Sequence, residues 1–177
     1  MEEIEVPTEH LHEKLEESVH HSEERWILMV ALTAALLAVF AAITSLLAGH
    51  HANEAMIEQI RSSDQWAFFQ AKGIKSAIVE SRMEVLSAMG EEPSVKDKEK
   101  VASYKEEQKE IDKKAREYGE SSEQHLSVHN TLAKGVTIFQ ISIAICAISA
   151  LTKRRWLWYI SMALGVAGIV FLGMGIL

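Results

Sequence analysis

Histidine and glutamate side chains recur at intervals of four residues in two separate stretches of this 177-residue chain. Residues four apart lie on the same face of a helix, so each stretch would present its polar groups together. Imidazole and carboxylate groups from facing helices are the ligands with which helical bundles hold transition metals such as zinc. The sequence therefore offers a candidate metal site, whose members are His50, His51, Glu54, Glu58, His125 and His129.

A second interpretation of the same residues needs no metal. Histidines and glutamates near a membrane surface are also ordinary polar residues of an interface, and a polar residue on a heptad seam can fix the register of two helices. The six residues do not form the Glu-x-x-His pattern of di-iron bundles. Both interpretations stay open, and no cofactor is certain.

Three apolar blocks decide where these polar residues are placed. Residues 26–48, 135–152 and 156–177 contain no Asp, Glu, Lys, Arg or His. At about 1.5 Å per residue, a helix of such a length crosses a ~30 Å hydrocarbon layer. We therefore predict an all-α membrane protein with three transmembrane helices and with membrane lipid as a partner.

The distribution of charge predicts an orientation in the membrane. A basic turn at 153–155 separates the second and third blocks, and short basic loops stay in the cytoplasm. We expect a multi-pass membrane protein with a cytoplasmic N-terminus and with residues 49–134 outside. The opposite orientation stays open, because charge is a poor guide for segments longer than about 60 residues.

The segment before the first block is acidic. Residues 1–25 carry nine acids and two bases, and Thr8, Leu11, Leu15 and Val19 suggest a capped amphipathic helix. The chain as a whole has a net charge of −7. This charge argues against a nucleic-acid partner.

Residues 49–134 are predicted to form a helical hairpin. The only strong helix punctuation lies at 90–94, where Gly90 suits a helix C-cap and Pro93 cannot continue a helix. Each arm carries a stripe at alternating spacings of three and four, which predicts a coiled-coil-like antiparallel stalk. The first-arm stripe is His50, Asn53, Ile57, Ile60, Asp64, Ala67, Ala71, Ile74, Ile78, Ser81, Val85 and Ala88. The second-arm stripe is Val101, Tyr104, Gln108, Ile111, Ala115, Tyr118, Ser122, His125, His129 and Leu132.

The position of the turn predicts the register of the two arms. Folding at about residue 92 pairs positions whose numbers sum to roughly 184. His129 would then lie opposite Ala55, and His125 opposite Gln59. In this register the histidines and glutamates converge within two helical turns.

Small and aromatic residues predict a homo-oligomer. Small residues at spacings of three and four let transmembrane helices approach closely, and aromatic side chains on the stalk are typical of contacts between subunits. The candidate interface comprises Ala35, Ala38, Ala42, Ser161, Gly165, Gly168, Trp66 and Phe69.

The sequence excludes several classes of activity. No nucleophile with a paired base and no glycine-rich phosphate loop is present, so we expect no enzyme. Apolar spans without ionisable residues disfavour an ion-coupled transporter. The favoured function is a homo-oligomeric structural or regulatory assembly. The alternatives are an oligomeric pore with a His/Glu-lined vestibule and a metal-binding or metal-sensing module.

Four stretches of the sequence carry a resemblance to a known family. They are "AGHHANEA" at 48–55, "SSDQWAFFQAKGIKS" at 62–76, "GVTIFQISIAI" at 135–145 and "LTKRRWLWYISMALGVAGIVF" at 151–171. In order and nearly over the whole chain, they resemble the bacterial proteins grouped as DUF4337, a domain of unknown function. The resemblance implies a bacterial membrane protein, which with the predicted spans means a multi-pass protein of the cytoplasmic (inner) membrane. It supplies no activity, cofactor or catalytic residue.

Overall fold

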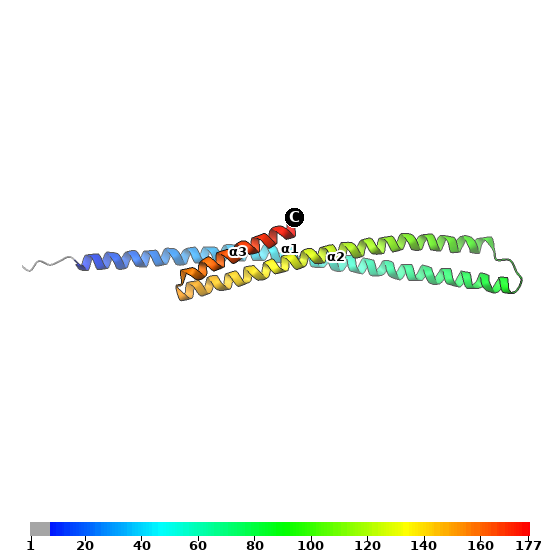
Figure 1. Cartoon of the computed structure of the whole chain (residues 1–177), viewed down its shortest axis with the longest axis horizontal. Helices are drawn as coiled ribbons and strands as arrows, with labels where there is room; N and C mark the ends of the chain where they lie inside the picture. Colours follow the sequence, from blue (N-terminus) through cyan, green and yellow to red (C-terminus); the bar gives the residue numbers. More distant parts are fainter. Residues whose placement is uncertain (1–7) are drawn as a thin grey trace, which may run out of the picture. The chain divides into compact units, whose positions relative to one another are not determined.

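The structure, a computed structural model, is all-helical over the residues it describes. It describes the backbone of residues 8–177, and the side chains from Arg25 onward. Three helices follow one another: α1 (Thr8–Ala88), α2 (Val95–Thr152) and α3 (Arg155–Ile176) (Figure 1). The predicted cap and apolar stripe of the N-terminal tail lie outside the residues whose side chains are described. All three helices are long and apolar enough to cross a membrane.

Local sequence explains where α1 ends and α2 begins. After Ala88, Gly90 takes a positive φ of 83°, a conformation that costs glycine little. The amide of Glu91 donates to the Leu86 carbonyl and that of Gly90 to the Ser87 carbonyl, which together form a Schellman motif. The link to α2 contains Pro93, and α2 begins at Val95, directly after Ser94.

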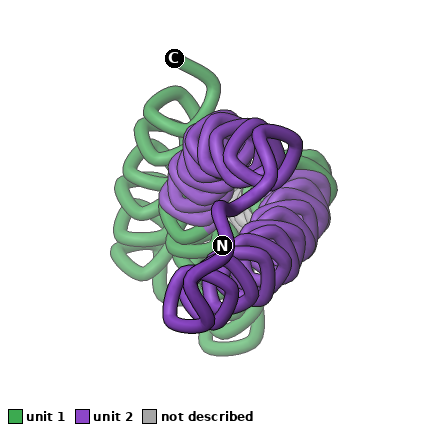
Figure 2. The backbone as a smooth tube through the Cα atoms, turned by 90° about the vertical axis from the view of Figure 1, so that its right-hand side faces the viewer, with its two compact units in different colours: residues 1–47, 130–177 green, residues 48–129 purple. Residues whose placement is uncertain are grey.

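The chain divides into two compact units, which are described separately (Figure 2). Unit 1 comprises residues 1–47 and 130–177, and unit 2 comprises residues 48–129. Unit 1 contains α3 and the apolar parts of α1 and α2. Unit 2 contains the charged segments of α1 and α2 that flank the link, together with the link itself, whereas the acidic first part of α1 belongs to unit 1.

Unit 1 is held together by apolar and hydroxyl contacts. The Phe40 and Phe139 rings stack with centroids 6.1 Å apart, and Phe139 is fully buried. Between α2 and α3, the Ser142 hydroxyl donates to the Ser161 carbonyl at 2.6 Å, and the Ser161 hydroxyl donates to the Ser142 carbonyl at 2.9 Å. These reciprocal bonds satisfy polar groups that could not reach water inside a membrane. The outward face keeps large apolar side chains such as Leu46 exposed.

Unit 2 is a packed pair of helices, in which α1 lies against α2. Three side chain to backbone hydrogen bonds cross between them: from Ser122 Oγ to the Ala55 carbonyl (2.7 Å), from Ser62 Oγ to the Ala115 carbonyl (2.8 Å), and from Gln108 Nε2 to the Phe69 carbonyl (3.1 Å). In each pair the residue numbers sum to 177, so the partners follow opposite orders along the two helices.

The predicted register, with sums near 184, is therefore wrong by seven residues, or about 10 Å of helix. The prediction assumed a symmetric turn. Instead, a sum of 177 places Val95 level with residue 82, so α1 continues for about six residues beyond the start of α2. Figure 1 shows this overhang, along which the link returns to α2.

The predicted α2 stripe is confirmed, and the predicted α1 stripe is wrong. Members of the α2 stripe such as Val101 and Ala115 are buried. Every member of the α1 stripe, from His50 to Ala88, is exposed. The face of α1 that meets α2 instead carries Ala48, Ala55, Glu58, Ser62 and Ser76, all buried. These mostly small residues allow a close approach and place the Ser62 hydroxyl within hydrogen-bonding distance of the Ala115 carbonyl of α2. Both faces of α1 have the same heptad spacing, so spacing alone does not distinguish them.

Candidate functional site

The histidines at the start of the unit 2 segment of α1 contact the histidines near the end of the unit 2 segment of α2. His51 Nδ1 lies 2.9 Å from His125 Nδ1, and the ring centroids are 5.2 Å apart. At this distance one nitrogen must carry a proton and donate it to the lone pair of the other. The contact therefore needs at least one neutral imidazole, and it would be lost if both rings became positively charged.

Two further histidines flank this pair. His50 is exposed and its ring lies 5.5 Å from the His51 ring in an edge-on arrangement. His129 Nδ1 lies 2.8 Å from the Ala48 carbonyl. Because a carbonyl only accepts, the Nδ1 of His129 carries the proton, which in the neutral ring leaves Nε2 as an acceptor.

The two predicted glutamate ligands, Glu54 and Glu58, do not lie together beside the histidines. Glu58 is buried and its Oε1 accepts a hydrogen bond of 2.8 Å from Arg61 Nη1. In the observed register Glu58 lies level with Gly119, about 9 Å along the helix from His125. Glu54 is half-buried and acts on His51 through its charge. The register shift therefore separates Glu58 from the histidines.

The surroundings of His51 favour its neutral form. Burial lowers the pKa of His51 below the ordinary 6.5, because a charged imidazole loses hydration there. The neighbouring His125, His50 and His129 lower this pKa further, and the carboxylate of Glu54 opposes them. The cluster is thus suited to a contact that depends on protonation.

The fit of a metal ion can be judged from the same geometry. Within the part of the chain that is described, no group of three or more His, Cys, Asp or Glu side chains could hold a metal ion. The His51 and His125 nitrogens bond to each other, and Glu58 bonds to Arg61. As it is arranged, the cluster supplies a hydrogen bond between two imidazoles that joins α1 to α2.

The small residues predicted for an oligomer interface fall into two groups. Ser161, Gly165 and Gly168 are buried within unit 1. A Cβ added at Gly165 would lie 2.6 Å from Leu37 Cδ2, so α1 already covers this face of α3. The other group, Ala35, Ala38 and Ala42, is exposed on α1.

The predicted aromatic residues are half-buried in unit 2. The Trp66 and Phe69 rings contact edge to face with centroids 5.5 Å apart, and the Arg116 guanidinium lies 5.8 Å from the Trp66 ring centre. Sequence reasoning missed Arg116, and it also missed Ser62, whose hydroxyl bonds to α2. A serine repeated at heptad spacing, as at Ser62 and Ser76, is the signal that could have identified this face.

Comparison with known proteins identifies the family. A family model described as "Domain of unknown function (DUF4337)" matches residues 26–177. Neither the curated proteins nor the solved structures give a match. The family match includes all of unit 2 and all of unit 1 from Trp26 onward. Because it covers most of the sequence, the chain belongs to the DUF4337 family.

Proposed function

We propose that this protein is a non-enzymatic, membrane-embedded structural module that associates with copies of itself. The observation that carries the proposal is the exposed small-residue face of α1, which contains Ala35, Ala38 and Ala42. Small residues let transmembrane helices approach until their backbones are in contact. The equivalent face of α3 is already covered within the chain, so the α1 face is the one available to a neighbour.

Composition supports the placement of the two units. The apolar spans would lie in lipid, and the charged unit 2 would lie in water as an antiparallel, coiled-coil-like hairpin. The basic turn at 153–155 favours a cytoplasmic N-terminus, with the hairpin outside a bacterial inner membrane. Spans without ionisable residues favour a structural role over ion-coupled transport.

The His51–His125 contact supports a regulatory contribution to the same role. Two imidazoles within hydrogen-bonding distance join α1 to α2 only while at least one of them is neutral. Acidification would therefore weaken this end of the α1–α2 seam in unit 2.

Cross-linking through Ala38 tests the self-association. In a chain whose single cysteine is removed as Cys146→Ala, Ala38→Cys should form a disulfide-linked dimer in oxidised membranes. Two cysteines can bridge when their Cα atoms lie about 4.4–6.8 Å apart, a distance that close-packed helices reach at small residues. Absence of the dimer would contradict the proposal.

Val166→Cys is the matched control. Val166 is exposed on α3 and is adjacent to Gly165, which faces Leu37 next to Ala38. Val166 therefore lies at a depth in the membrane similar to that of Ala38, but on a different exposed face of unit 1. Equal cross-linking at Ala38 and Val166 would mean random collision, and it too would contradict the proposal.

A further inference from the structure

An apolar stripe on the outer face of α1 in unit 2 is left uncovered by the side chains that the structure describes. Its residues alternate at spacings of three and four along the helix, and each of them is exposed. Ile74 and Ile78 keep 61% and 63% of their surface in contact with solvent. The outer stripe consists of Ile57, Ile60, Asp64, Ala67, Ala71, Ile74, Ile78, Ser81, Val85 and Ala88.

The outer stripe is long enough to form a stable interface. From Ile57 to Val85 it extends about 42 Å at 1.5 Å per residue. Fully burying an aliphatic side chain removes on the order of 60–120 Å² from water. The isoleucines, Val85 and the neighbouring Met56 and Phe68 together offer roughly 400–800 Å². The upper end of this range is comparable with the roughly 800 Å² per partner of a standard interface. Apolar patches of this size mark interaction sites on soluble surfaces.

We propose that the outer stripe packs, parallel and in register, against the same stripe of a second copy of this chain. The inference rests on the proposed function, because copies anchored in one membrane share one orientation. A heptad repeat of this kind is self-complementary in that arrangement, since each stripe residue meets its own counterpart.

Charges beside the outer stripe favour the parallel arrangement. One flank carries the bases Arg61, Lys75 and Arg82, and the other flank carries mainly neutral residues with Glu84. Parallel helices bring one flank against the other, so the three bases meet neutral residues and not one another. Antiparallel helices would bring the basic flank against itself, which is unfavourable.

The basic flank does not call for an acidic partner or an anionic lipid surface. Arg61 Nη1 already lies 2.8 Å from Glu58 Oε1, and Arg82 Nη2 lies 3.0 Å from Asp97 Oδ2. Two of the three bases thus already have a carboxylate partner within the chain, although their exposed guanidinium groups would still face the same flank in an antiparallel pair. The apolar stripe between the flanks is what remains to be covered.

Asp64 interrupts the outer stripe and would face its own counterpart in the pair. A polar residue at one heptad position sets the register and number of helices at a cost in stability. Two facing carboxylates also repel each other. Asp64→Asn should therefore strengthen the association while leaving the register unchanged.

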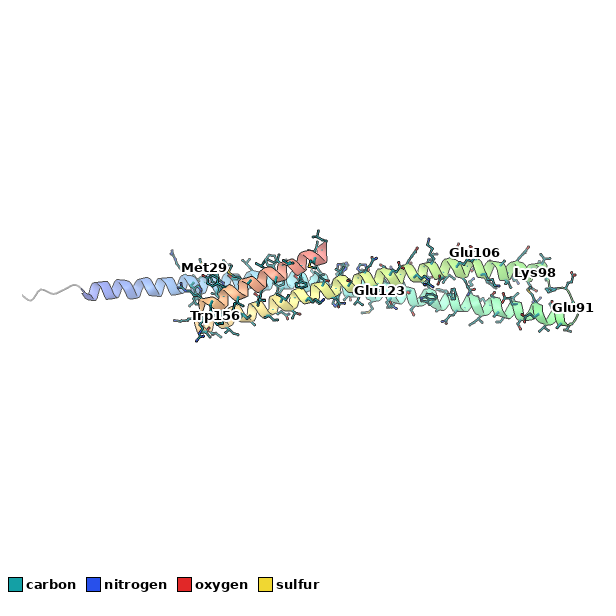
Figure 3. All side chains as sticks on the ribbon, in the orientation of Figure 1. Met29, Glu91, Lys98, Glu106, Glu123 and Trp156 are labelled. Atoms are coloured by element: carbon teal, nitrogen blue, oxygen red, sulfur yellow. The ribbon has the colours of Figure 1, made fainter. Side chains whose placement is uncertain are left out.

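Cysteine cross-linking in membranes tests the arrangement in the full chain with Cys146→Ala. Ile57→Cys and Val85→Cys, near the two ends of the outer stripe, should each form a disulfide with the same residue of another copy. Glu106→Cys, on the exposed face of α2 (Figure 3), is the control and should react at least tenfold more slowly. All three positions are exposed, so the folded monomer should tolerate each change.

The outcomes separate the stripe from the proposed function. Ala71 lies near the middle of the outer stripe. If Ala71→Cys forms a disulfide while Ile57→Cys and Val85→Cys do not, the pair is antiparallel and the inference is overturned. Products with a different protein, or rates equal to that of Glu106, would overturn it as well. If Ala38→Cys still forms a dimer in those cases, the proposed self-association survives without the stripe. If Ile57 and Val85 react and Ala38 does not, the stripe survives alone.

Discussion

Replacing Gly168 with alanine tests how tightly α3 packs inside unit 1. A Cβ at this position would lie 2.7, 2.8 and 2.9 Å from three atoms of the Phe139 ring. Side-chain carbons do not approach so closely, so the ring would have to move. Phe139 is fully buried and stacks on Phe40 at 15° between the ring planes, which leaves the ring little space.

The expected magnitude follows from two opposing effects. Alanine favours a helix over glycine by about 1 kcal/mol. Overpacking a well-filled interior costs about 1–3 kcal/mol. Gly173→Ala is the matched control on the same helix, because nothing lies within 4 Å of a Cβ placed there. The gain in helix propensity is common to both variants, so Gly168→Ala should be the less stable by about 1–3 kcal/mol.

Unfolding in detergent micelles, followed by circular dichroism during a denaturant titration, measures this difference. It corresponds to roughly a 5- to 150-fold change in the unfolding equilibrium constant. Equal stability of the Gly168 and Gly173 variants would refute the packing of α3 against Phe139. The small-residue face of α3 would then be free to meet another chain.

Three further predictions address the rest of the molecule. Because the pKa of folded His51 lies below 6.5, the unfolded chain binds more protons at this residue between the two pKa values. The contribution of His51 to stability should be complete above pH 6.5 and be lost as the pH falls from there through the folded pKa, and His51→Asn should flatten this part of the pH dependence in denaturant titrations. Asp97→Ala removes the partner of Arg82 near the tip of unit 2 and should cost roughly 1–2 kcal/mol of unfolding free energy, between the values for exposed and buried ion pairs. A reporter that is active only outside the cytoplasm should be active when inserted within 90–94, and activity of only a cytoplasmic reporter there would reverse the orientation.

The sequence predicts the three helices well, and it also predicts the face of α2 that packs against α1. Gly90 and Pro93 mark the interruption between α1 and α2, because their backbone preferences act locally. The α2 face is predictable for a related reason: only one of its stripes, with Val101 and Ala115, is both apolar and periodic. Local preferences and periodicity need no knowledge of the partner helix.

The α1 face and the register depend on information that periodicity does not contain. Two stripes on α1 share the heptad spacing, and the more apolar one, with Ile74 and Ile78, is the exposed one. Close approach and hydroxyl bonding select the other face, as the Ser62 hydrogen bond to α2 illustrates. The overhang at the link then shifts the register by one heptad. For this reason the candidate site contains the His51–His125 contact and leaves Glu58 with Arg61.

An intrachain disulfide measures the register of the two helices in unit 2 most directly. The exposure of the outer stripe depends on this register and on which face of α1 packs against α2. In full-length protein with Cys146→Ala, the pair Ala55→Cys and Ser122→Cys should form an intrachain disulfide, since Ser122 Oγ bonds to the Ala55 carbonyl at 2.7 Å. The pair Ala55→Cys and His129→Cys should not, because seven residues of helix displace the partner by about 10 Å, beyond the ~7 Å limit between Cα atoms. A disulfide in the second pair and none in the first would contradict the arrangement described here.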